Sequence, residues 1–195
     1  MICYHSTVIP GLKELRPFSA EFTSLPDPVV YLTISKQLAL HYIWDMKRIG
    51  VKMPMLKIQP DGVLIFQEMF SGALEYFYKG VSGYIYTCQG DFPMDSRVQI
   101  PFCTASDTTV PVTEYEYIED VYAQIMRYQE RGTFVYEKYE SLPQWRIDII
   151  RGTILRFIHR NQLLIKKEHA ASRFVMEKFP QYWKEAEILA AHGFL

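Results

Sequence analysis

The order of strand and helix patterns along the chain constrains its fold more than any other feature. Up to Glu137, short β-branched and aromatic runs alternate with turn residues, and beyond Ser141 apolar residues recur at helical spacing to the end. Strands first and helices last are typical of an α+β fold with helices packed on one side of the sheet. We therefore predict a core over residues 1–140 and a C-terminal helical extension over residues 141–195, packed on the core as one globular unit.

The predicted elements of the core are short and are bounded by turn signals. Gln59–Gly62 has the composition of a hairpin turn, because Pro, Asp and Gly favour tight turns. Ser35 is a good helix cap and Gly50 a good helix stop. The predicted strands are residues 1–8, 29–33, 55–58, 63–66, 75–78, 84–88, 109–117 and 133–137, and the predicted helices of the core are residues 36–48 and 119–131, the second closed by Gly132.

The composition excludes several classes of protein. Hydrophobic residues make up 49% of 195 residues, enough to bury a sizeable core. The net charge of −1 argues against a general attraction to nucleic acid or anionic lipid. Cys3, Cys88 and Cys103 are widely spaced, as expected of buried thiols in a reduced cytoplasmic protein. No segment approaches the roughly 20 apolar residues that cross a bilayer, so we expect a cytoplasmic location and no membrane partner.

Three blocks carry residues suited to chemistry. Tyr4-His5-Ser6-Thr7 lies on the first predicted strand. Tyr31 ends the second strand and Tyr42 lies in the third turn of the following helix, so two aromatic rings can face each other across a slot. Glu116 precedes the helix that begins near residue 119. An aromatic slot beside a histidine is suited to holding the nicotinamide ring of NAD.

These three blocks resemble those of the ADP-ribosyltransferase fold, in the branch of diphtheria toxin and the poly(ADP-ribose) polymerases. The order His, Tyr, Tyr, Glu is the same, and the resemblance covers residues 3–125. It implies a split β-sheet core and an enzyme that cleaves NAD, as substrate, at the nicotinamide glycosidic bond. The ADP-ribose would pass to a macromolecular acceptor, protein or nucleic acid, without a metal.

The resemblance also implies roles for the residues that bind NAD. His5 would bond the adenosine-side ribose, and Thr7 would support the polar edge of the strand. Main-chain groups of Ser6 would hold the nicotinamide carboxamide. Tyr31 and Tyr42 would stack on the two faces of the nicotinamide ring.

The catalytic role falls to Glu116, which would stabilise the positively charged sugar formed when the glycosidic bond breaks. Glu114 lies two residues earlier on the same strand face. In arginine-modifying members of the fold, the upstream glutamate of such a pair engages the acceptor, so the resemblance implies that Glu114 would orient the acceptor. The chain departs from the family at Ser6, where glycine is usual, and at Ala39, where the polymerases carry a hydroxyl. Two alternatives stay open: a catalytically inactive NAD- or ADP-ribose-binding module of the same fold, and a relative that processes nucleic-acid ends through the basic stretch 146–167.

Overall fold

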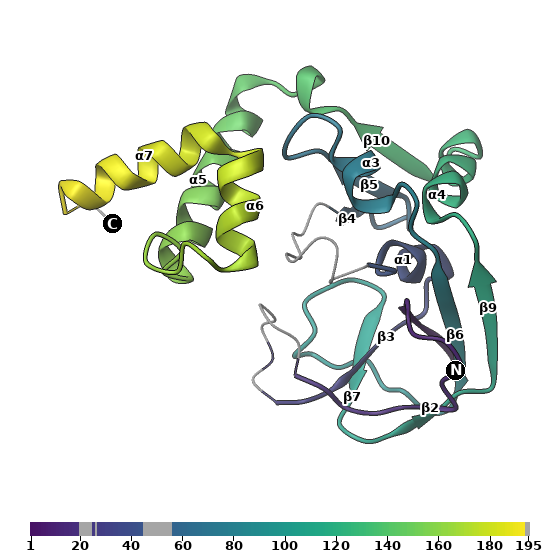
Figure 1. Cartoon of the computed structure of the whole chain (residues 1–195). Coiled ribbons are helices and arrows are strands. Elements are labelled where there is room, and N and C mark those ends of the chain that lie inside the picture. The colour runs from purple at the N-terminus through teal and green to yellow at the C-terminus, as the bar shows by residue number, and fades with distance from the viewer. Residues whose placement is uncertain (20–24, 26, 45–55, 194–195) are drawn as a thin grey trace. The chain divides into compact units, whose positions relative to one another are not determined.

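The protein is mixed α+β, with antiparallel sheets and α-helices, as predicted (Figure 1). The computed structural model describes residues 1–19, 25, 27–44 and 56–193. Internal contacts divide the chain into two compact units. The first comprises Met1–Asp45, Ile58–Leu64 and Phe77–Val135, and the second Met46–Lys57, Ile65–Tyr76 and Tyr136–Leu195. That residues 1–140 and 141–195 pack as one globular unit stays a prediction.

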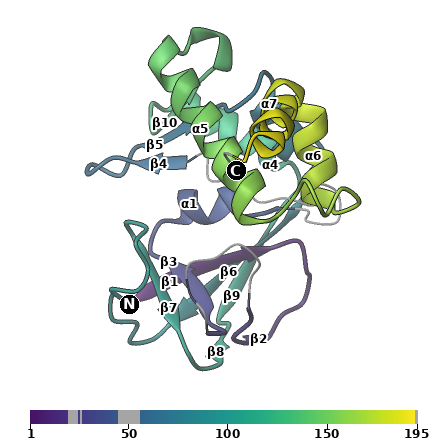
Figure 2. The ribbon, with the colours of Figure 1, turned by 90° about the vertical axis from the view of Figure 1, so that its left-hand side faces the viewer.

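The first unit is built on a five-stranded antiparallel sheet of order β7-β3-β1-β6-β9. Helix α1 packs on β1 and β3 from one side of this sheet (Figure 2). The other side is covered by the two-stranded ribbon of β2 and β8, and a core cluster forms around Cys3, Leu32 and Cys88. The elements are β1 (Ile2–Thr7), β2 (Glu14–Leu15), β3 (Val30–Thr33), α1 (Lys36–His41), β6 (Gly83–Gln89), β7 (Cys103–Ser106), β8 (Val110–Pro111), β9 (Glu114–Ile118) and α4 (Val121–Glu130).

The three predicted thiols are buried and free in the structure. Cys3 and Cys88 face each other on β1 and β6, inside the core cluster. Burial disfavours the thiolate, so it raises the pKa of all three groups, that of Cys88 and that of Cys103 to about 11. They serve as small apolar residues of the core.

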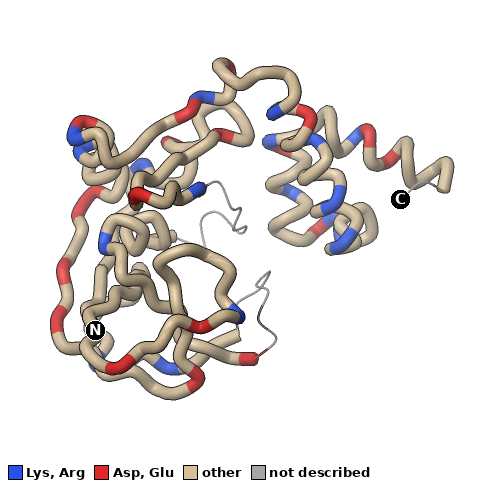
Figure 3. Tube along the Cα trace, turned by 180° about the vertical axis from the view of Figure 1, so that it is seen from behind, with Lys and Arg blue, Asp and Glu red and all other residues tan. Residues whose placement is uncertain are grey.

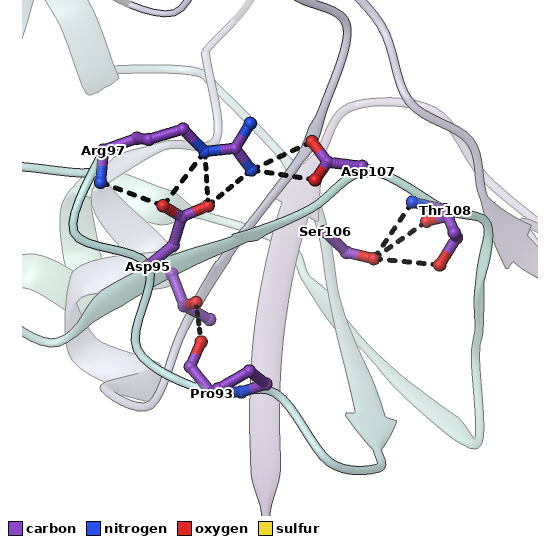
Figure 4. A network of polar contacts seen from close by, with 7 residues as sticks. Pro93, Asp95, Arg97, Ser106, Asp107 and Thr108 are labelled. Carbon is purple, nitrogen blue, oxygen red and sulfur yellow. Dashed lines mark hydrogen bonds and ion pairs between the residues drawn. The ribbon is translucent and has the colours of Figure 1, made fainter.

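The loop before β7 is tied to the end of that strand by one arginine (Figure 4). Arg97 donates to both carboxylate oxygens of Asp95 on its own loop and to both of Asp107 beyond β7, at 2.6–3.0 Å. The two carboxylates raise the pKa of the Arg97 guanidinium, and Arg97 lowers the pKa of Asp95. Thr104 on β7 donates to the Pro93 carbonyl at 2.6 Å and adds a second tie.

A second, three-stranded sheet has the order β10-β5-β4, with β4 (Leu56–Ile58), β5 (Leu64–Gln67) and β10 (Phe134–Glu137). The predicted hairpin turn is confirmed. Gln59 and Val63 are bonded by N–H···O at 2.9 Å, and Gly62 has φ +87°, a conformation that glycine adopts without strain.

The second unit contains helices packed around aromatic side chains. Phe70, Phe174 and Phe179 contact one another edge to face at centroid distances of 5.6–6.0 Å. The buried Glu68 carboxylate accepts from Tyr136 Oη at 2.6 Å and from two main-chain amides, so its charge is well compensated. The helices are α3 (Ala73–Tyr78, ending in the first unit), η1 (Tyr139–Ser141), α5 (Gln144–Arg160), α6 (Ala170–Lys178) and α7 (Pro180–Ala191).

Three predicted elements differ from the structure. Residues 75–78 belong to helix α3 and not to a strand, because Ala73, Leu74, Phe77 and Tyr78 are buried at helical spacing. Residues 109–117 form two strands, since pairing passes from β2 to β6 after Pro111.

The helix predicted over residues 36–48 ends at His41, although its cap at Ser35 is confirmed. The carbonyl of His41 accepts from Tyr78 Oη at 2.8 Å and from the Trp44 indole, which occupies the acceptor that a longer helix needs. Tyr42 is therefore the C-cap of α1 and not part of a third turn. Residues 45–48 and the predicted stop at Gly50 lie outside the described residues.

Candidate functional site

Strand β1 pairs very unequally with its two neighbours. Its register with β6 runs through every residue, from Ile2 opposite Gln89 to Thr7 opposite Tyr84. Its register with β3 consists of Tyr4 opposite Thr33 alone. The sheet therefore opens between the C-terminal half of β1 and the start of β3.

The pairing pattern fixes which main-chain groups face this opening. Met1 and Gly90 exchange two hydrogen bonds, at 2.7 and 3.1 Å, one residue before the register of β1 and β6 begins. Hydrogen-bonded and non-hydrogen-bonded pairs alternate in antiparallel sheets, so Cys3, His5 and Thr7 direct their N–H and C=O groups at β6. The N–H and C=O of Ser6 consequently point toward β3, where pairing is not continued.

The imidazole of His5 lies at the same opening. Its Nδ1 is 2.9 Å from the main-chain oxygen of Tyr31, the carbonyl that the Ser6 amide would reach if the pairing continued. A carbonyl can only accept, so Nδ1 of His5 carries the proton of this hydrogen bond. His5 and Tyr31, predicted to border one site, are brought together.

Ser6 also joins β1 to helix α1 through its side chain. Its Oγ donates to the Ala39 carbonyl at 2.5 Å, and the residue is buried. Ser6 does not belong to the residues with positive φ, so serine in place of glycine causes no backbone strain here. The two positions at which the sequence departs from the ADP-ribosyltransferase pattern are thus hydrogen-bonded to each other.

The two predicted stacking residues lie at opposite ends of the segment that carries α1. Tyr31 is half-buried on β3, with Phe18 edge-on at 6.5 Å between ring centroids. Tyr42 caps α1, and burial, followed by the nearby Cys103 thiol, raises its pKa to about 12. The facing of the two rings across one slot stays a prediction.

Glu116 has a partner that the sequence pattern did not suggest. Its Oε2 lies 2.5 Å from Nζ of Lys36, the first residue of α1, and each side chain is about half exposed. The hydrogen bond that Lys36 donates to Glu116 raises the pKa of Lys36. The Ser35 cap fixes where α1 begins, so it also fixes the position of this lysine. The position of Lys36 in the sequence, between Tyr31 and Tyr42, was the one signal that could have indicated this partner of Glu116.

Strand alternation divides the predicted residues between the two faces of the sheet. Ser6, Ile85 and Glu116 lie opposite one another in a row on the face that carries α1. Ser6 and Glu116 are two strands apart, about 10 Å between Cα atoms. Tyr31 shares this face, because Thr33 lies opposite Tyr4.

His5 and Thr7 belong to the other face by the same alternation, and His5 reaches the opening only through its bond to Tyr31. The Thr7 hydroxyl accepts from the Ile9 amide at 3.3 Å, so it supports the end of the strand. Glu114 is exposed on the same face as Glu116, opposite Thr87.

Three of the six basic residues in the stretch 146–167 form ion pairs within the second unit. Arg146 lies near Glu137, Arg151 binds both carboxylate oxygens of Glu185, and Lys167 lies near Glu187. These pairs reduce its attraction for phosphate.

The comparisons with known proteins add no family: no family model, curated protein or solved structure matches the chain. In the parts that the structure describes, no three His, Cys, Asp or Glu side chains are grouped to hold a metal ion. No helix among the described residues has the length and hydropathy to cross a membrane. The site itself offers main-chain amide groups in an open sheet, a histidine and a carboxylate held by a lysine.

Proposed function

We propose that the protein is an ADP-ribosyltransferase that cleaves NAD at the nicotinamide glycosidic bond and transfers ADP-ribose to a macromolecular acceptor. In this proposal the opened sheet is the split core of the ADP-ribosyltransferase fold. The observation that carries it is the interrupted pairing of β1 with β3, which directs the main chain of Ser6 at a space bordered by His5 and Tyr31.

The nicotinamide end of NAD suits this opening. A primary carboxamide has an N–H donor and a carbonyl acceptor, so it can replace the missing strand partner of the Ser6 C=O and N–H. Rings of Tyr31 and Tyr42 on the two sides of the pyridinium would each add about 0.5–2 kcal/mol through cation–π attraction.

The catalytic group in this proposal is Glu116. Loss of nicotinamide leaves a positively charged, oxocarbenium-like sugar, and a carboxylate on the same face as Ser6 stabilises that charge. Lys36 holds the carboxylate in place from the first turn of α1. A positioned carboxylate also avoids reorganisation when the sugar becomes charged.

His5 would bind the sugar on the adenosine side. In this proposal the ring contacts a ribose hydroxyl while its Nδ1–H stays bonded to the Tyr31 carbonyl.

The test is nicotinamide release from NAD by the wild-type chain and by Glu116→Gln. The amide keeps the size of the side chain but loses the charge, and we expect the rate to fall about 10²–10³-fold. Glu119→Gln makes the same charge change just beyond β9 and is the matched control. Unchanged release by Glu116→Gln, or no release by the wild type, rejects the catalytic assignment.

An inactive binding module of the same fold is the second candidate, and Ser6 in place of the usual glycine favours it. Its side chain occupies the space between β1 and α1, where glycine would leave room. Calorimetric titration separates the two candidates. NAD binding without nicotinamide release supports the module, whereas binding with release supports the enzyme.

A further inference from the structure

β9 has the largest share of exposed residues among the described strands of the first unit. β9 ends the five-stranded sheet, so β6 pairs with one of its sides and no strand among the described residues pairs with the other. The first four of its residues are exposed, Tyr115 to 61% and Tyr117 to 53%. Figure 1 shows β9 at the margin of the sheet.

The pairing pattern again tells which main-chain groups are open. Tyr84, Tyr86 and Cys88 direct their groups at β1, so Ile85 and Thr87 direct theirs at β9. The bond from the Thr113 amide to the Thr87 carbonyl, at 2.9 Å, agrees with this direction. Glu114 and Glu116, opposite Thr87 and Ile85, therefore bond inward to β6. The N–H and C=O groups of Tyr115 and Tyr117 point outward.

This edge lacks two of the usual protections against strand addition. Natural edge strands are often blocked by lysine, proline or a bulge, and β9 contains neither lysine nor proline. Its side chains instead form two different faces. Tyr115 and Tyr117 pack beside Tyr84, at 6.0 and 5.1 Å between ring centroids, on one face. Glu114 and Glu116 lie on the other.

The charge along this strand is of one sign. Glu114, Glu116, Glu119 and Asp120 lie within seven consecutive residues that include no lysine or arginine. Figure 3 shows acidic positions along the β9 segment. Lys36 pairs with Glu116 from α1, and Asp120 caps α4, so Glu114 and Glu119 carry most of the uncompensated charge.

We propose that the outer edge of β9 binds an extended peptide with lysine or arginine at alternate positions, added as a further strand of the sheet. Residues directly opposite each other on neighbouring strands share a face. The basic residues would lie on the face of Glu114 and Glu116, where Glu114 carries the uncompensated charge, and the intervening residues would contact Tyr115 and Tyr117. The bonds to the outward groups of the two tyrosines supply affinity, and the alternating side chains supply specificity.

A second copy of the chain fits this edge less well. Antiparallel pairing of two β9 strands would place Glu114 and Glu116 of both copies on one face, opposite like charges. A basic peptide removes that repulsion. The binding stands on β9 alone, and only the further step, in which this peptide is the ADP-ribose acceptor, rests on the proposed function.

The experiment uses the full chain without NAD, so its outcome is separate from that of the catalytic test. A fluorescein-labelled peptide of alternating arginine and threonine is titrated by anisotropy, beside a block peptide of the same composition. We expect the alternating peptide to bind several-fold more tightly, and its affinity to fall with added salt. Methylation of alternate peptide nitrogens should abolish the preference, because it removes the strand bonds.

Two substitutions at one position separate backbone from side chain. Tyr115→Pro removes an outward N–H, a change that edge strands tolerate, and should weaken binding about tenfold. Tyr115→Thr removes the ring but keeps the N–H and should weaken it less. Thermal melting checks that both variants fold. If they do not fold, binding of the methylated peptide to the wild type still tests the strand bonds. The proposal is overturned if the alternating and block peptides bind equally, or if the methylated peptide binds undiminished. It is also overturned if sedimentation shows a dimer and this dimer buries the edge of β9.

Discussion

The two flanks of β1 show how one strand can serve the core on one side and a site on the other. Toward β6, pairing is continuous, and Cys3, Tyr86 and Cys88 are fully buried beneath the β2–β8 ribbon. Toward β3, pairing stops after Tyr4, and the residues at the opening, His5 and Ser6, are polar. Their hydrogen bonds run to Tyr31 and to helix α1 in place of a sheet ladder.

This difference has a simple energetic basis. Main-chain groups must be paired when they are buried, so a strand flank without a partner strand needs side chains, water or a ligand. On the β3 flank the His5 ring is hydrogen-bonded to the Tyr31 carbonyl, and the Ser6 main chain is directed at the opening. Substitutions on the two flanks should therefore affect different properties: stability toward β6 and ligand binding toward β3.

The largest effect is expected from Tyr86→Ala, on the closed flank. Tyr86 is fully buried, its hydroxyl donates to the Ile9 carbonyl at 2.7 Å, and it accepts from the Leu12 amide at 3.3 Å. Loss of a buried aromatic side chain costs about 3–5 kcal/mol of the free energy of unfolding. Urea denaturation measures this cost.

Tyr84→Ala, at a half-buried position two residues earlier on the same strand, is the control and should cost clearly less. The fraction of Tyr86→Ala that remains folded should bind NAD with the affinity of the wild type. A cost below about 1 kcal/mol for Tyr86→Ala would remove the structural role assigned to this flank.

A smaller effect is expected from the titration of His41, on the buried side of α1. Its Nδ1–H donates to the Gln37 carbonyl at 2.9 Å, its Nε2 is buried without a partner, and burial lowers its pKa to about 4. The unfolded chain binds this proton near pH 6.5, so between pH 6.5 and 4 it holds more protons than the folded chain. Stability should therefore fall by about 3 kcal/mol as the pH falls through this range.

His41→Phe isolates this contribution, because phenylalanine can replace the ring that stacks on Phe134 without a titrating group. The difference in unfolding free energy between wild type and variant should change with pH from 6.5 to 4 and stay constant above it. A difference independent of pH would show that His41 is not kept neutral by burial.

Local signals sufficed for much of the fold. The Ser35 cap, the Gly62 turn and the buried cysteines each depend on near neighbours in sequence or on composition, and the structure agrees with all three. The strand predicted over residues 75–78 is wrong. Tyr and Phe favour strands locally, whereas burial of one helical face and the hydrogen bond from the Leu74 amide to the Glu68 carboxylate favour α3. The early end of α1 depends on Tyr78, which is distant in sequence.

The candidate site was only partly accessible from the sequence for the same reason. The proximity of His5 and Tyr31 followed from the motif order, but the pairing of Glu116 with Lys36 depends on how β9 and α1 are placed. The division of His5 and Glu116 between two faces is a property of register, which no single strand pattern specifies. The opening beside Ser6 likewise appears only when both flanks of β1 are compared.

The smallest effect on stability, and the most informative contrast with Tyr86→Ala, is expected from His5→Ala. The half-buried ring donates a hydrogen bond to the Tyr31 carbonyl, and loss of this bond should cost about 0.5–1.5 kcal/mol in urea denaturation. Affinity for NAD, measured by calorimetry, should fall about tenfold, because a sugar hydroxyl loses its contact with the ring. His5→Phe keeps a ring of similar size without the nitrogens, so it should reproduce the loss of affinity. If His5→Ala instead cost as much stability as Tyr86→Ala and left NAD binding unchanged, the β3 flank of β1 would be structural, and the division between the two flanks would not hold.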